Sequence, residues 1–450
     1  MSTLARGTRI LVGGAIALTA LSFCTVARAA EIPEWVKNIN VDLKGQVFAE
    51  TTDLGSGMDH RGSRDDIHFQ RLRLSLTGKF DDVWGFFWQT CGATGTSKQG
   101  SLGYGATGQD TNADDRDVRI IDAYVTAAIS DSLNFKIGLT KIPLTRANLD
   151  DCFAPLSQDR SMFVYTAYGS SPAKFSRDLG VMAWGGFFDH KLQYSMGVFQ
   201  GREGFTQVAN PFNQVNSPYT SVFYNSSIQP KNSLNYVGRV AYSFLDPEPG
   251  SGYAGSYLGQ ASILTVGAGY AYQASAVYKN VTNAGVIQNG DTVDYKAIAG
   301  DFMFEYPTAN AGTYTLTGQY LKNDFQDAYL TNKNPGDLLA NIGGLQGQKE
   351  GNFIKAAYIL PMTVGKEGLI QPYLLAENWR VAFILGVTGQ RIKQTGGGIN
   401  YYVHGQNVRF TVEYLKTDFN TPTNLIGDVV GTTPKITSFN TYRMMLQFVL

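Results

Sequence analysis

The sequence has little charge, few cysteines and no long apolar run in its main part. Charged residues make up 16 % of the 450 residues, against ~25 % in an average protein, and there are 3 Cys. No apolar run of about 18 residues follows the N-terminal region, which excludes transmembrane helices. Basic and acidic residues number 37 each, so no basic excess indicates a nucleic-acid partner. With 43 % apolar residues, the chain is not disordered.

The N-terminal segment, 1–29, has the features of a secretory signal peptide. Arg6 and Arg9 precede an apolar stretch, 10–24, that is too short to span a bilayer, and the Ala-Arg-Ala at 27–29 is a small-x-small cleavage motif. Cleavage after this motif removes three arginines and no acid. Lys plus Arg then falls from 37 to 34 against 37 acidic residues, so the mature chain carries a net charge of −3.

The rest of the chain, 30–450, is expected to form one domain, because no linker or charge block divides it. It repeats a strand pattern of about ten residues in which apolar and polar side chains alternate between Gly, Asn and Asp. The segments with this pattern are 40–51, 66–79, 82–91, 117–129, 133–141, 177–188, 190–200, 234–244, 260–274, 293–306, 313–323, 352–361, 368–378, 396–404, 407–418 and 437–450. Their even number predicts an all-β fold, a 16-stranded antiparallel transmembrane β-barrel.

The connections between these segments alternate in length. The long ones are 52–65, 92–116, 142–176, 201–233, 275–292, 324–351, 379–395 and 419–436, and the links between them are short except for 245–259. Outer-membrane barrels have short periplasmic turns and long external loops. The alternation therefore favours such a barrel over a soluble β-sandwich.

The two faces of each segment differ in polarity. Leu72 and Leu74 share one face of the second segment, whereas Arg71 and Arg73 share the other. Lipid offers a charged side chain no partner, so the arginines must point inward. Burying them in a dry core would be costly, and the pattern therefore predicts a water-filled lumen.

Five short motifs resemble the phosphate-selective porin O and P family. They are Asp-Ala-Tyr at 122–124, Gly-Leu-Thr-Lys-Ile-Pro at 138–143, Arg-Asp-Leu-Gly-Val at 177–181, Gly-Val-Phe-Gln-Gly at 197–201 and Gly-Ile-Asn-Tyr-Tyr at 398–402. The resemblance implies a sixteen-stranded homotrimeric porin of the bacterial outer membrane that passes small inorganic anions, phosphate among them, and lies in lipid and lipopolysaccharide. Gln70 stands where the family usually has the first Arg of a pair.

The longest loop, 142–176, is the candidate constriction. Inward or loop-borne charges would decide which ion is enriched in such a pore. The candidate pore-lining residues are Arg71, Arg73, Lys136, Lys141, Arg146, Arg160, Lys174, Arg239 and Asp122. They predict passive diffusion with a preference for anions. A pore without selectivity, in which these arginines only pair with acids, or a structural or adhesive barrel remain alternatives.

The sequence gives no sign of catalysis or of a cofactor. It contains no P-loop, nucleophile elbow or His-Glu-x-x-His motif, and its four histidines lack metal-ligand spacing. A channel rather than an enzyme is therefore expected, with no metal. Whether Cys91 and Cys152 form a disulfide is left open by the sequence.

Overall fold

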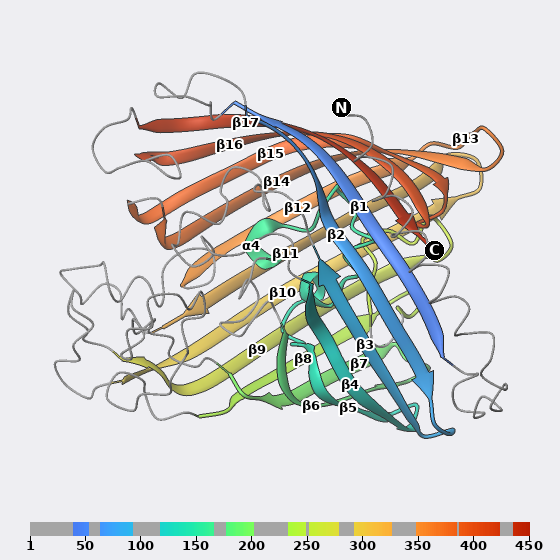
Figure 1. Ribbon diagram of the computed structural model, residues 1–450, viewed down its shortest axis with the longest axis vertical. Coiled ribbons are helices and arrows are strands. Elements are labelled where there is room, and N and C mark those ends of the chain that lie inside the picture. The colour runs from blue at the N-terminus through green and yellow to red at the C-terminus, as the bar shows by residue number, and fades with distance from the viewer. Residues whose placement is uncertain are drawn as a thin grey trace, which may run out of the picture.

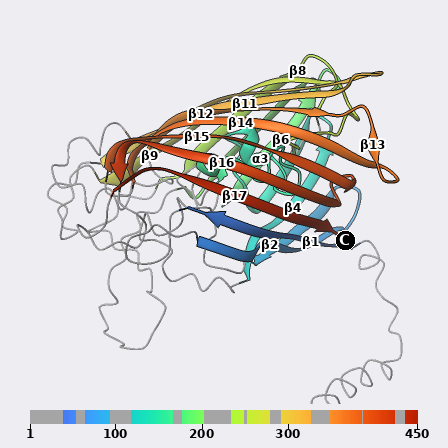
Figure 2. The same cartoon turned by 90° about the horizontal axis from the view of Figure 1, so that it is seen from above.

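The chain forms a closed antiparallel β-barrel in the computed structural model (Figure 1). The structure describes residues 39–53, 64–92, 118–165, 177–201, 233–248, 252–278, 292–325, 348–384, 387–423 and 435–450. Neighbours in sequence are neighbours in the sheet, and pairing of the first with the last strand closes the barrel, with Lys44 opposite Val449. The view from above shows this closure beside β1 and β17 (Figure 2).

The described residues contain seventeen strands, of which β13 has only two residues. The bounds are β1 Asn40–Thr52, β2 Arg64–Lys79, β3 Trp84–Gly92, β4 Arg119–Ser130, β5 Leu133–Lys141, β6 Arg177–Phe187, β7 Leu192–Phe199, β8 Asn235–Ser243, β9 Ile263–Tyr278, β10 Thr292–Thr308, β11 Gly312–Asp324, β12 Lys349–Ile359, β13 Thr363–Val364, β14 Gly368–Ile384, β15 Val387–His404, β16 Val408–Thr423 and β17 Ile436–Val449. Because β13 only extends the β12–β14 turn, the wall has the sixteen strands that the sequence predicts.

One predicted connection is wrong. Residues 379–395 were expected to be a long loop, but most of them continue β14 and β15, which stay paired as far as Ile384 and Val387. The alternation reverses in this stretch: Trp379 and Val381 are fully buried on the inner face, whereas Arg380 is exposed on the outer face. The outer face of a barrel can be polar where it does not contact lipid. Residues 379–395 therefore lack the sequence pattern of a membrane strand.

The outer face of the barrel is apolar, as the alternation predicts. Leu72, Leu74, Val240 and Phe410 are exposed, while Arg71 and Arg73 are buried on the inner face. Exposed aromatic side chains gather at the ends of the strands that carry the short turns; they are Phe80, Trp84, Phe187, Phe188, Tyr242, Phe244, Tyr306 and Tyr314. Such a girdle is typical of a barrel at the membrane interface.

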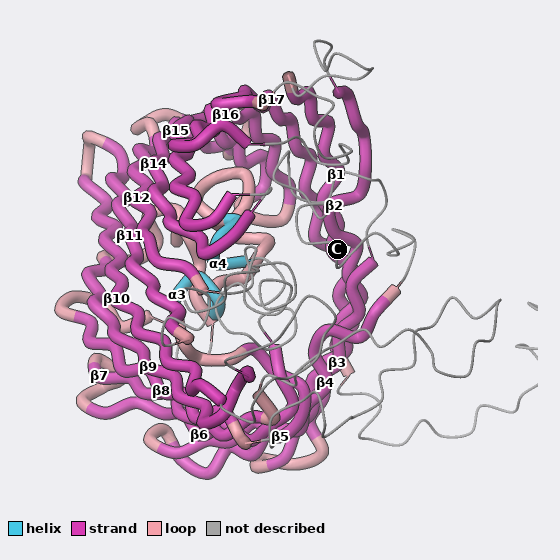
Figure 3. The backbone as a smooth tube through the Cα atoms, turned by 90° about the vertical axis from the view of Figure 1, so that its left-hand side faces the viewer, coloured by secondary structure: helices cyan, strands magenta, loops and turns pink. Residues whose placement is uncertain are grey.

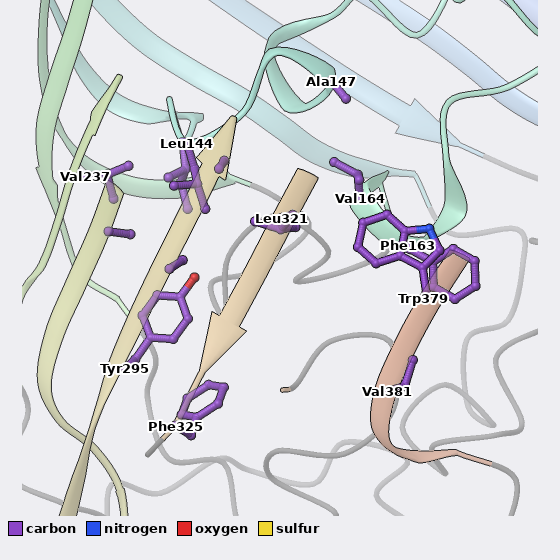
Figure 4. Packing of buried hydrophobic residues seen from close by; sticks show 14 of the residues in the cluster. Leu144, Ala147, Phe163, Val164, Val237, Tyr295, Leu321, Phe325, Trp379 and Val381 are labelled. Atoms are coloured by element: carbon purple, nitrogen blue, oxygen red, sulfur yellow. The ribbon is translucent and has the colours of Figure 1, made fainter. Parts of the chain in front are cut away.

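The interior differs from a uniformly wet lumen. Toward the ends with long loops, inward apolar side chains of β7–β17 form a buried cluster that includes Tyr295, Leu321 and Trp379. Phe163, from the loop between β5 and β6, stacks on Trp379 at 5.1 Å between ring centroids (Figure 4). The loop is therefore held on the barrel wall partly by apolar burial.

The described helices are short. They are α3, Arg146–Leu149, and α4, Met162–Tyr165, and both lie inside the barrel (Figure 3). Thr145 caps α3 by accepting a hydrogen bond from Asn148 N at 3.0 Å. No described helix is long and apolar enough to cross a bilayer.

Candidate functional site

The loop between β5 and β6, here called loop 3 (142–176), enters the barrel as the sequence predicts for a constriction. Its described part, 142–165, lies beside β10–β14 (Figure 3). Arg146 N donates to Asp301 in β10, and Ala147 N donates to Gln319 in β11. Loop 3 therefore crosses the lumen and lies on one side of it.

Inward polar side chains of distant strands bind the loop backbone. Gln46 of β1 donates to Cys152 O (3.0 Å), and Gln447 of β17 donates to Phe153 O (2.7 Å). Arg409 of β16 donates to Pro155 O (2.7 Å), and Asn400 of β15 donates to Leu156 O (2.8 Å). These bonds satisfy loop carbonyls that have left the solvent. The strands that hold the loop in this way, β1, β2, β10–β12 and β14–β17, are called the loop-bearing wall.

Arg71 joins this wall to the loop by an ion pair. Its guanidinium donates to both carboxylate oxygens of Asp159, at 2.9 and 2.7 Å, and to Gln46 at 2.6 Å. Burial opposes ionisation of Asp159, but Arg71 overcomes it and lowers the pKa of that carboxyl. Arg71 is only 1 % exposed, so it holds the loop rather than facing open water.

Arg146 and Arg239 are also neutralised. Arg146 pairs with Asp150 at 2.8 Å and with Glu248, and Arg239 pairs with Asp301 at 2.6 Å. Both guanidinium groups lie over the ring of Tyr253, at 5.0 and 5.6 Å. For these residues and Arg71, the alternative in which lumen arginines pair with acids is the arrangement found.

The wall of β3–β6 carries two lysines, of which Lys141 at the end of β5 also binds loop 3. Lys136 lies over the ring of Tyr124 at 5.2 Å, and Lys141 donates to the carbonyls of Leu149 (3.1 Å) and Asp150 (2.7 Å). The partners in these contacts are neutral, although Asp122 lies close enough to Lys136, and Asp151 to Lys141, for electrostatic attraction. Asp122, by contrast, pairs with Arg177 of β6 at 3.2 Å. Arg177 lies in a motif that carried the family resemblance but was not among the predicted site residues.

The remaining predicted residues lie near the middle of loop 3 or beyond its described part. Arg160 donates to the carbonyls of Ala147 (3.0 Å) and Asp150 (3.1 Å), and so ties the loop to itself. Arg73 lies over the ring of Phe153 at 5.5 Å. Lys174 lies outside the described residues, as does the signal peptide.

Nearby cations lower the pKa values of two residues of loop 3. Burial raises the pKa of the Cys152 thiol, but Arg73, Arg160 and Arg71 lower it to about 7. The pKa of Asp151 is about 2, because Lys44 and Lys141 outweigh burial. Cys152 is fully buried and, like Cys91, a free thiol, so the disulfide that the sequence left open is not formed.

Several lumen charges were missed as site residues. Lys355 donates to Ser157 Oγ (2.6 Å) and Asp159 O (3.2 Å), and Lys349 donates to Phe163 O. Glu248 lies in the link that breaks the length alternation, where no strand pattern indicated its direction. Among the described residues, no group of His, Cys, Asp or Glu could hold a metal ion.

Comparisons with solved structures support the fold. An anion-selective porin from Comamonas acidovorans has 12 % identity and a TM-score of 0.50, covering 92 % of this chain and 99 % of that one. OprB of Pseudomonas putida has 9 % identity and a TM-score of 0.51, covering 92 % and 95 %. At such identities the likeness shows a shared barrel fold. No curated protein sequence matches the chain.

A comparison with family models is more specific. Residues 40–213 match the model described as phosphate-selective porin O and P. Four of the five motifs noted in the sequence fall wholly inside this range, at 122–124, 138–143, 177–181 and 197–201. The closed barrel and this match indicate a porin-like channel of the bacterial outer membrane, and they confirm the resemblance to the phosphate-selective porin O and P family.

Proposed function

We propose that the chain is an anion-preferring pore for passive diffusion of small inorganic anions and solutes, and that the ions pass between loop 3 and the wall of β3–β6. The loop fills the other side of the lumen, where it is bound to the loop-bearing wall. Beside the proposed path the side chains of Lys44 and Asp151 are 22 % and 46 % exposed. Lys136 and Arg177 on the β3–β6 wall are buried.

The observation that carries the preference is the imbalance of charge along this path. On the wall itself, Lys136, Lys141 and Arg177 outnumber Asp122 and Asp178, while Asp151 of loop 3 pairs with Lys44 across the path. The two lysines have a ring or carbonyls as partners instead of carboxylates. Fixed positive charge in a narrow, partly desolvated passage enriches anions. The net charge of −3 that is expected after signal-peptide cleavage does not describe this local excess.

Phosphate is the anion that the family resemblance favours, and the same resemblance supports a homotrimer in lipid and lipopolysaccharide. The chain departs from the family at Gln70, where the first Arg of the usual pair is absent, and this departure concerns the selectivity for phosphate. Gln70 donates to Asp159 at 3.2 Å, so this position now serves the loop contact.

The test is a zero-current potential across a planar bilayer with a KCl gradient. If the pore prefers anions, the zero-current potential shifts toward the equilibrium potential of chloride. Added phosphate should then reduce the chloride current. Cation preference would overturn the proposal. A barrel that conducts nothing would support the structural or adhesive alternative instead.

A further inference from the structure

The connection between β8 and β9 does not stay at the rim of the barrel. It runs over 244–262, of which 244–248 and 252–262 are described. Strand polarity puts it on the side of the short turns, where the other links have only a few residues. We call it the inner link, because its described part contacts loop 3 inside the lumen.

Backbone hydrogen bonds join the inner link to loop 3. Asp151 N donates to Tyr253 O at 2.8 Å beside an isolated parallel bridge between Asp150 and Tyr253. Gly255 N donates to Ala154 O at 2.6 Å. Two segments about 100 residues apart thus satisfy each other's backbone groups within the lumen.

The inner link is itself anchored to the barrel wall. The Glu305 carboxylate of β10 accepts hydrogen bonds from Tyr257 N (3.0 Å), Gly259 N (2.8 Å) and Ser256 Oγ (2.9 Å). Glu305 is fully buried, and these donors supply the solvation that it has lost. The link is therefore a fixed support and not a loose turn.

A buried ion pair completes the contact. Glu248 of the link pairs with Arg146 at the start of α3, and Tyr257 OH donates to the same carboxylate at 2.6 Å. Arg146 also donates to Ala254 O at 2.9 Å. The side chains of Glu248 and Arg146 are 0 % and 3 % exposed, so water does not screen this pair.

Backbone packing leaves no space between the two segments at one position. A Cβ on Gly255 would overlap the backbone of Leu156 and Pro155, whereas a Cβ on Gly252 would meet nothing within 4 Å. The two glycines lie in the same link, and neither has a left-handed φ. They provide a matched pair in which only one substitution pushes the link away from loop 3.

We propose that the inner link is a second constriction element and that Glu248 is a positioning residue within it. Glu248 fixes the position of Arg146 and thereby the start of loop 3. The pore therefore has a single open conductance. This inference rests on the proposed channel function. It predicts that loosening the link alters the pore without removing a residue of the β3–β6 wall.

The experiment records single channels of the full-length protein with Gly255→Ala and with Gly252→Ala. Gly255→Ala should replace one open level by substates whose conductances differ by about twofold, because the constriction loop is displaced. Gly252→Ala should keep the level of the unmodified protein. If Gly255→Ala does not fold, Tyr257→Phe, which removes only the hydroxyl bonded to Glu248, should give the same substates more rarely.

The charge of the link is tested by Glu248→Gln against Glu367→Gln. Glu367 lies on the same side of the barrel, but its side chain is 64 % exposed. Glu248→Gln should give substates and a higher anion preference, whereas Glu367→Gln should change neither. If the unmodified protein prefers anions and all link variants keep a single level, the inference is overturned while the proposed function stands. An unmodified protein without anion preference would overturn the proposed function alone.

Discussion

The two sides of the lumen use the same residue types for different purposes. On the loop-bearing wall, Arg71 and Arg409 donate hydrogen bonds to loop 3 and hold it in place. On the β3–β6 wall, Lys136 has an aromatic face as its partner. In the proposed pore, an inward cation is structural where loop 3 covers it and acts electrostatically where the proposed ion path runs. Counting inward charges along the sequence does not separate these roles.

The largest effect is expected from breaking the loop-bearing wall at Arg71. Arg71→Ala removes the ion-pair partner of the buried Asp159 and leaves it with the donors Gln70 and Arg160 N, which should lower the free energy of unfolding by about 3–5 kcal/mol. Urea unfolding of the refolded barrel, or the temperature at which its gel mobility changes, measures this. The exposed Arg391 of β15 provides the control, since Arg391→Ala should stay within about 0.5 kcal/mol. Equal stability of the two variants would remove the distinction between the walls.

A smaller effect, on anion preference, is expected from ionisation of the Cys152 thiol in loop 3. With a pKa of about 7, Cys152 is neutral at pH 6 and mostly a thiolate at pH 8. Its negative charge then acts on Lys141 and Arg177 of the β3–β6 wall, so anion preference should fall modestly between these pH values. Cys152→Ser should abolish that change, measured as the zero-current potential at each pH. The same fall in the serine variant would assign the titration to another group.

The fold could be predicted because the information is local and periodic. Alternation with a period of two places Arg71, Arg73 and Arg239 inward without knowledge of their partners. The partners could not be predicted: Arg71 and Asp159 are 88 residues apart in sequence, and no strand pattern sets the path of loop 3. The link at 245–259 was visible as an irregular length, but its contact with Arg146 depends on tertiary packing.

The wrong assignment of 379–395 has the same origin. The prediction relied on apolar side chains on the outward face, yet in this part of β14 the apolar Trp379 faces inward and the charged Arg380 faces outward. The alternation is intact, but its polarity is reversed. A pattern of apolar outward side chains therefore identifies only the lipid-facing part of a strand.

The central claim is that cations of the β3–β6 wall set the anion preference and those of the loop-bearing wall do not. Its most direct test compares the anion-to-cation permeability ratios of Lys136→Gln and Lys355→Gln in a KCl gradient. A unit positive charge about 6 Å from an ion in water attracts an anion and repels a cation by about 0.7 kcal/mol each, so Lys136→Gln should lower the ratio about tenfold. Lys355→Gln should leave it nearly unchanged, because its ammonium is held by Ser157 and Asp159 of the loop. An equal fall in both variants, or a fall only in Lys355→Gln, would contradict this account.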